Sequence, residues 1–320
     1  MTDRPLRTAG DALRWGSSLL REAGLGDPGR EAAILLCSVL ECDKAVLYAY
    51  PERKLSPGEA SLFRRLIHRR CARVPLQYLT RRQEFMSLSF HVDERCFIPR
   101  PETELLVEEA LKHLGEDGAG KLAVDLGTGC GCIAVSLAYW CPNLRVWACD
   151  VSAAALQVAL RNCRAHKVQD RVRLVKGDLW AAFAGWDLEE RVDVVVANPP
   201  YVSEEELASV QPEVRHEPPE ALVPPVYATE FYRRIFEGAA VALKDGGLLL
   251  VETAPSLIPQ LEPILRQQPV WMEVRVLRDL AGAERALAAT RECRRCVERP
   301  PRCRELGCGR WTATIQTRHR

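Results

Sequence analysis

Apolar residues recur at helical spacing in the first quarter of the chain. The periodic stretches are residues 12–23, 29–40 and 58–73, and they are separated by Asp27-Pro28, Pro51 and Ser56-Pro57. Proline and capping residues at such breaks are typical of helix boundaries. The pattern therefore predicts a small helical domain over residues 1–86.

Short apolar runs alternate with helical stretches in the rest of the chain. Strands are expected near residues 122, 145, 173, 193, 248 and 273. This alternation is typical of the α/β class, in which a doubly wound, Rossmann-like parallel sheet binds its ligand at the carboxyl ends of the strands. We expect a hairpin and linker over residues 87–104, because residues 85–92 alternate, and the α/β domain over residues 105–287.

A glycine-rich turn lies between the first of these strands and a helix. It comprises Gly127, Thr128, Gly129, Cys130 and Gly131, and Asp125 precedes it near the strand end. Glycines let a ligand approach the backbone, and the helix start offers free N–H groups. A dinucleotide fingerprint would need glycine at Cys132, so the spacing favours S-adenosylmethionine over NAD. Asp125 fits a supporting role or contact with a ligand amine.

The next two strand ends carry acidic residues. Asp150, about twenty residues beyond the turn, could accept hydrogen bonds from ribose hydroxyls, or it could merely precede the helix that opens at Ser152. Asp178 could bind an adenine amino group. Trp180 could pack on the adenine or belong to the core. These residues occur in the order that a nucleoside cofactor requires.

Asn198, Pro199, Pro200 and Tyr201 follow the apolar run 192–197. Two prolines stiffen the turn, so its acceptors are positioned before a substrate arrives. The Asn198 side-chain oxygen and the Pro199 carbonyl could hold a planar NH2 group, and Tyr201 could stack on it. The motif predicts methyl transfer to a poorly nucleophilic nitrogen, although an isolated Asn-Pro-Pro can also be an ordinary rigid loop.

Together with these motifs, the segment 97–104, Phe-Ile-Pro-Arg-Pro-Glu-Thr-Glu, resembles the HemK/PrmC glutamine methyltransferases. The resemblance runs from about Ala32 to about Arg285. It implies a class I S-adenosylmethionine-dependent domain that methylates the glutamine of a Gly-Gly-Gln motif in peptide chain release factors, with the helical domain recognising the substrate. Arg100 and Thr103 are then expected near the substrate. Prolines at 224 and 225 depart from the glycine-rich stretch usual in the family, which bears on closure over the substrate.

Composition leaves the partners partly open. The chain has 320 residues and a formal net charge of +1, which gives no global nucleic-acid signature. A local arginine cluster comprises Arg64, Arg65, Arg69, Arg70, Arg73, Arg81 and Arg82. It could be a solvated helix face, or it could contact a release factor or ribosomal or other RNA. An adenine-N6 methyltransferase acting on DNA or RNA, and a non-enzymatic reader of release factors, remain alternatives.

The thirteen cysteines fall into two groups. Nine lie between Cys37 and Cys163, and we expect buried, reduced thiols there. The other four are Cys293, Cys296, Cys303 and Cys308, in an arginine-rich tail (288–320) that we expect to be disordered. Their spacing is not that of a common zinc module, so no metal site is predicted. With no bilayer-spanning run or secretory signal, a cytoplasmic location is expected, and the mitochondrial matrix is the alternative.

Overall fold

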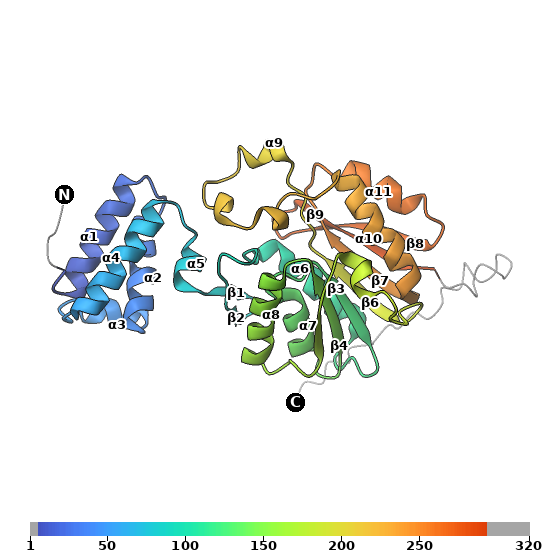
Figure 1. Ribbon diagram of the computed structural model, residues 1–320, viewed down its shortest axis with the longest axis horizontal. Coiled ribbons are helices and arrows are strands. Elements are labelled where there is room, and N and C mark those ends of the chain that lie inside the picture. Colours follow the sequence, from blue (N-terminus) through green and yellow to red (C-terminus); the bar gives the residue numbers. More distant parts are fainter. Residues whose placement is uncertain (1–5, 293–320) are drawn as a thin grey trace, which may run out of the picture.

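The computed structural model describes residues 6–292 of the chain. It has a helical region at the N-terminal end and a larger α/β region, joined through a short helix and a hairpin (Figure 1). Among residues 6–292, no helix is long and apolar enough to cross a bilayer.

The helical region contains α1 (Ala9–Glu22), α2 (Pro28–Leu40), α3 (Lys44–Ala49), α4 (Pro57–Cys71) and α5 (Leu76–Thr80). Two of the three predicted breaks are helix starts: Asp27 caps α2, and Ser56 with Glu59 forms a reciprocal capping box on α4. The third, Pro51, lies in a turn that follows α3. The helices share a core that includes Leu20, Leu36 and Phe63. The short helices α3 and α5 were not predicted, because six and five residues are too few to show a period.

A hairpin of β1 (Gln83–Phe85) and β2 (Leu88–Phe90) follows, then a 3-10 turn, η1 (Pro101–Thr103), and α6 (Glu104–Leu114). The hairpin begins at Gln83, slightly before residue 86, where the sequence suggested that the helical domain ends. η1 begins at Pro101, because the fixed φ of proline and its missing N–H suit the first helical position.

The α/β region is a seven-stranded sheet in the order β5-β4-β3-β6-β7-β9-β8. Its elements are β3 (Leu122–Leu126), α7 (Cys132–Trp140), β4 (Arg145–Asp150), α8 (Ala153–Ala165), β5 (Val172–Lys176), η2 (Leu179–Phe183), β6 (Val192–Ala197), α9 (Glu204–Leu207), η3 (Val214–His216), η4 (Pro219–Ala221), α10 (Ala228–Ala242), β7 (Leu243–Glu252), α11 (Ile258–Arg266), β8 (Trp271–Arg278) and β9 (Glu284–Arg291). Helices α6, α7 and α8 cover one face and α10 and α11 the other, and each face has its own apolar core. The doubly wound architecture is confirmed.

The sheet differs from the prediction at one edge. Strand β9 was not predicted, and it pairs antiparallel with both β7 and β8, so the sheet is mixed and not wholly parallel. β9 also continues the sheet to Arg291, beyond residue 287. Its alanine-rich sequence has weak strand propensity and is a strand because it lies between two others.

Sequence order reverses at the centre of the sheet. From β3 the chain moves through β4 to β5, and then returns to place β6 on the other side of β3. The carboxyl ends of β3 and β6 therefore flank a crevice, which is where ligands bind in doubly wound sheets.

Candidate functional site

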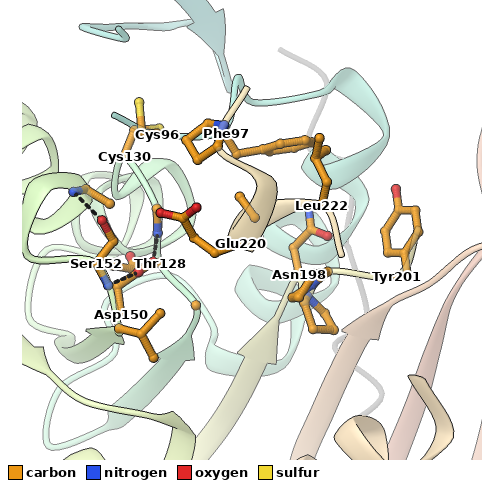
Figure 2. A pocket seen from close by; sticks show the side chains of 18 of the residues that line it. Cys96, Phe97, Thr128, Cys130, Asp150, Ser152, Asn198, Tyr201, Glu220 and Leu222 are labelled. Carbon is orange, nitrogen blue, oxygen red and sulfur yellow. Dashed lines mark hydrogen bonds between the residues drawn. The ribbon is translucent and has the colours of Figure 1, made fainter. Parts of the chain in front are cut away.

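A cavity of about 530 Å³ lies beyond the carboxyl ends of β3, β4 and β6. The loops after these strands form one side of it, and segments 95–103 and 199–225 form the other. Figure 2 shows Thr128, Asp150 and Ser152 together on one side and Asn198 and Tyr201 on the other. Of the residues predicted from sequence, those that line the cavity are Arg100, Thr103, Gly127, Thr128, Gly129, Cys130, Asp150, Asp178, Asn198, Pro199, Pro200 and Tyr201.

The glycine turn follows β3 with positive φ at Gly127, Gly129 and Gly131. A Cβ added at Gly129 would meet no other atom within 4 Å, so the backbone faces open space there. Gly131 does not line the cavity; its Cβ would lie 3.1 Å from the Cβ of Ala159 in α8. Gly129 thus leaves room for a ligand, whereas Gly131 allows close packing of the turn against a helix.

Asp125 supports this turn from beneath and does not line the cavity. Its Oδ2 accepts a hydrogen bond from the Thr128 hydroxyl at 2.6 Å and one from the Ala134 N–H at 3.2 Å. The side chain is fully buried, and burial raises the pKa of Asp125 to about 7. This geometry fits the supporting role considered for Asp125, not contact with a ligand amine.

Asp150 ends β4 and lines the cavity. Its Oδ2 accepts from the Gly129 N–H and its Oδ1 from the Ser152 N–H, both at 2.8 Å. Each carboxylate oxygen can accept a second hydrogen bond, so a ligand diol could still be held. Ser152 caps α8 through the Ala155 N–H, and Asp150 holds the Ser152 N–H before it, so Asp150 both supports the helix start and faces the cavity.

Asp178 and Trp180 both follow β5, but their side chains lie in different surroundings. Asp178 lines the cavity, and its Oδ2 accepts from Arg234 at 2.6 Å. The Trp180 indole N–H instead donates to the Ile235 carbonyl at 3.1 Å, and its ring packs over Gly238 of α10. Trp180 does not line the cavity, and the core alternative considered for it matches its position.

The segment from Asn198 to Tyr201 leaves β6 directly into the cavity. The Asn198 Nδ2 donates to the Thr103 hydroxyl at 3.1 Å. With its NH2 engaged there, the side-chain oxygen of Asn198 is the free acceptor of the amide. Thr103 is almost fully buried, so it fixes the orientation of Asn198.

Arg100 lines the cavity but is already paired. Its guanidinium forms an ion pair with the buried Glu217 and stacks over the Phe97 ring, 4.7 Å from the ring centroid. Glu217 also accepts from the Ile98 N–H at 3.0 Å. Arg100 therefore ties the segment before η1 to the loop that precedes η4.

Comparison with known proteins gives the family. Residues 11–80 match the PrmC N-terminal domain family, and residues 101–224 match the Methyltransferase small domain family. A release factor glutamine methyltransferase from Rhodopirellula baltica is 35% identical over 280 residues, which cover 86% of this chain and 94% of the relative. One from Moorella thermoacetica is 39% identical over 282 residues, covering 88% and 96%. The chain belongs to the release factor glutamine methyltransferases.

A solved structure supports the fold independently. The catalytic domain of hMettl16, in complex with the MAT2A 3'UTR hairpin 6, has a TM-score of 0.52 at 18% identity, over 69% of this chain and 81% of that one. At this identity the likeness concerns the fold alone. It confirms the methyltransferase-type α/β architecture.

Several cavity residues of this release factor glutamine methyltransferase were not predicted from sequence. They are Cys96, Phe97, Glu220, Leu222, Val223 and Pro225, and Glu217 behind them. No local pattern in the sequence shows which cavity these residues face. Val223 and Pro225 bring the proline-containing stretch to the cavity wall, as expected if it covers the substrate.

Much of the arginine cluster is engaged in internal contacts. Arg70 is buried and pairs with Glu31 at 2.6 Å and Glu213 at 3.0 Å, and Arg73 also reaches Glu213 at 3.4 Å. Arg81 pairs with Glu94 at 2.7 Å. The cluster thus serves in part to join α4 to the loop that lines the cavity. Contact of this release factor glutamine methyltransferase with RNA stays a prediction.

The cysteines in the described part of the chain are all free. Burial raises the pKa of Cys149 and Cys163 to about 12, so these thiols stay protonated and unreactive. Six of the nine are buried as expected, whereas Cys37, Cys42 and Cys71 are half-buried. Cys293, Cys296, Cys303 and Cys308, and the predictions about them, lie outside the described residues.

Proposed function

We propose that this protein transfers a methyl group from S-adenosylmethionine to the side-chain amide nitrogen of the glutamine in a release factor Gly-Gly-Gln motif. The observation that carries the proposal is the orientation of Asn198. Its NH2 is engaged by Thr103 while its oxygen is left free at the cavity, in a chain that belongs to this family. An amide NH2 group needs such an acceptor.

The cavity fits S-adenosylmethionine on its own features. Gly129 leaves the backbone open to close approach, and both oxygens of Asp150 retain accepting capacity. We assign the glycine turn and Asp150 to the nucleoside, and Asp178 to its amino group, whereas Trp180 drops out of the site. When bound, the cofactor supplies an electrophilic methyl group on a sulfonium sulfur.

The residues on the other side of the cavity orient the acceptor. The Asn198 oxygen and the Pro199 carbonyl would accept the two amide protons of the glutamine, which turns the nitrogen lone pair away from its own carbonyl. Tyr201 would stack on the flat amide. Holding the reacting groups in line contributes most of the rate in such a mechanism, because an amide nitrogen cannot be made basic before transfer.

We further infer that the helical region, residues 6–80, takes part in recognising the release factor. Glu213 in the loop beside the cavity contacts Arg70 and Arg73 of the helical region, and the His216 ring Nε2–H donates to the Ala72 carbonyl at 3.1 Å. Figure 1 shows this loop, which carries α9, between the two regions. A large substrate that enters the cavity would therefore lie next to the helical region. A release factor as substrate is consistent with a cytoplasmic location, and the mitochondrial matrix is the alternative.

The test uses the purified chain, S-adenosylmethionine with a labelled methyl group, and a release factor with its Gly-Gly-Gln motif intact. A matched release factor with asparagine in place of that glutamine is the control. We expect one methyl on the glutamine, located by mass spectrometry, and none on the control. Label in DNA or RNA offered in parallel, with none in the release factor, would instead identify an adenine methyltransferase.

A further inference from the structure

A buried carboxyl group lies behind the Asn198 to Tyr201 segment and has no assigned role. Glu252 is the last residue of β7, and the pairing of Val251 with Ala197 places it beside Asn198 at the carboxyl end of the sheet. Only 4% of Glu252 is exposed, and it does not line the cavity. Its Oε2 has no hydrogen-bond partner among the described residues. A buried carboxyl group of this kind is costly and calls for a function.

Two hydroxyl groups from the site reach this carboxyl group. The Thr103 and Tyr201 side chains both interact with the Glu252 carboxyl group and lower its pKa, against the effect of burial. Thr103 is also the residue that accepts the Asn198 Nδ2 hydrogen at 3.1 Å. Glu252 is therefore connected to Asn198 through a single hydroxyl group, and to Tyr201 directly.

The directions of the hydrogen bonds that link Asn198, Thr103 and Glu252 follow from the chemistry of the Glu252 carboxyl group. An ionised carboxylate only accepts, so the single hydroxyl hydrogen of Thr103 is directed to Glu252. The Thr103 oxygen can then only accept from Asn198, which must offer its NH2. The Asn198 oxygen is thereby left to face the cavity. A side-chain amide is nearly symmetric in shape, and only its partners decide which way it points.

We propose that Glu252 is a positioning residue that, through Thr103, fixes the amide of Asn198 with its oxygen toward the substrate nitrogen. This inference rests on the proposed function and adds a residue to it. Protonated Glu252 could donate to Thr103, whose hydrogen would then go to the Asn198 oxygen. The amide would be turned over, and its NH2 would repel the NH2 of the substrate glutamine.

The protonation of Glu252 is adjustable near neutral pH. Burial chiefly raises the pKa of Glu252, to about 7, and the charge of Glu102 raises it further, while Thr103, Tyr201 and Arg285 oppose the shift. From α10, the Tyr232 hydroxyl donates to the Glu252 main-chain carbonyl at 2.8 Å and holds the strand end in place. The accepting, ionised form predominates above pH 7, so turnover should rise with pH through that value.

The experiment compares wild type with Glu252→Leu, Thr103→Val, the two combined, and the conservative Thr103→Ser. Turnover of the release factor is measured at saturating cofactor from pH 5.5 to 9. We expect kcat at pH 8.5 to fall about 10- to 100-fold in each of the first two, with cofactor Kd and release factor KM unchanged. The double variant should be no slower than the slower of the two single variants, because Glu252 and Thr103 act through the same series of hydrogen bonds. Thr103→Ser should stay within about threefold of wild type.

The pH profile separates positioning from a packing role. In wild type, kcat should fall about tenfold between pH 8 and pH 6 with a midpoint near 7, and this limb should be absent from Glu252→Leu and Thr103→Val. The proposal would be overturned if the losses of kcat in the two single variants multiplied in the double variant. It would also be overturned if the single variants kept the fall in kcat between pH 8 and pH 6. A parallel loss of cofactor affinity would also overturn it, because it would show general damage to the site.

A second measurement does not depend on turnover. The side-chain NH2 resonance of Asn198, identified by its loss in Asn198→Ala, is followed by NMR against pH in the protein alone. It should titrate near pH 7 in wild type and not in Glu252→Leu. An Asn198 resonance that is indifferent to Glu252 would refute the positioning role even if the protein methylates release factor. The expected titration without methyl transfer would support the role while contradicting the proposed substrate.

Discussion

Replacing Asp125 with asparagine should remove a large pH dependence from the stability of this protein. Asp125 is fully buried beneath the glycine turn, and burial raises its pKa from the ordinary 3.8 to about 7. Below about pH 4 the carboxyl is neutral in both the folded and the unfolded chain. Between about pH 4 and pH 7 the carboxyl is ionised in the unfolded chain but still protonated in the folded chain, because ionisation there would place a charge in a buried site. The stability that the neutral form provides is therefore lost with rising pH.

The magnitude follows from the two pKa values. At about 1.4 kcal/mol for each pKa unit, the rise from 3.8 to about 7 corresponds to roughly 4 kcal/mol of unfolding free energy lost between pH 4 and pH 8. Asparagine has the same shape and no charge, and its oxygen can keep the Thr128 and Ala134 hydrogen bonds. Its NH2 would take the place of Oδ1, which has no partner among the described residues, at a cost of about 1–3 kcal/mol at every pH.

The assay is urea denaturation of wild type and Asp125→Asn at pH 5, 6, 7 and 8, followed by circular dichroism. We expect wild type to be more stable than the variant at pH 5, and this difference to shrink by about 2.5 kcal/mol by pH 8. Asp245→Asn, at an exposed position, is the matched control and should parallel wild type. A difference between wild type and Asp125→Asn that stays constant within about 1 kcal/mol from pH 5 to pH 8 would refute the reasoning.

Three further predictions concern the site and its support. Asn198→Ala should lower kcat about 100-fold and leave cofactor Kd unchanged, because the residue orients the acceptor amide. Single-turnover kinetics measure the first quantity and calorimetry the second. Normal turnover would remove Asn198 from the mechanism. Asp150→Ala should weaken cofactor binding about 10- to 100-fold by calorimetry, since it removes both accepting oxygens; unaltered affinity would contradict the nucleoside assignment. Gly238→Ala should lower stability by about 2 kcal/mol, because its Cβ would lie 2.1 Å from the Trp180 ring, while cofactor affinity stays the same. Gly29→Ala, where a Cβ meets nothing within 4 Å, is the neutral control for that thermal melt, and equal melting temperatures would disprove the packing argument.

Most of the residues singled out at the strand ends come together in the folded chain. Asp150, Asn198 and the glycine turn line one cavity, because each follows a strand whose direction is set by the parallel sheet. Trp180 shows the limit of this reasoning. It follows β5 as expected, but η2 turns its indole to the Ile235 carbonyl. No local pattern distinguishes an aromatic ring that packs on a ligand from one that packs on a helix.

Residues that act from a distance along the chain could not be found from the sequence. Glu252 lies 149 residues after Thr103, and Glu217 lies 117 residues after Arg100. An acidic residue at the end of an apolar strand has the same local signature whether it faces solvent or a buried hydroxyl. Strand β9 was missed for a related reason, because its alanine-rich sequence becomes a strand only between β7 and β8.

The α/β class, the family and the candidate residues for contact with a nucleoside and a planar nitrogen all follow from the amino-acid sequence. They do so because strand and helix periods, glycine turns and the Asn-Pro-Pro-Tyr step are local, and local backbone chemistry sets them. Only the tertiary structure decided which groups are buried, which hydrogen bonds orient Asn198, and which arginines are already paired. Burial and the direction of a hydrogen bond depend on groups that folding brings together from distant parts of the chain, so they exist only in the folded molecule.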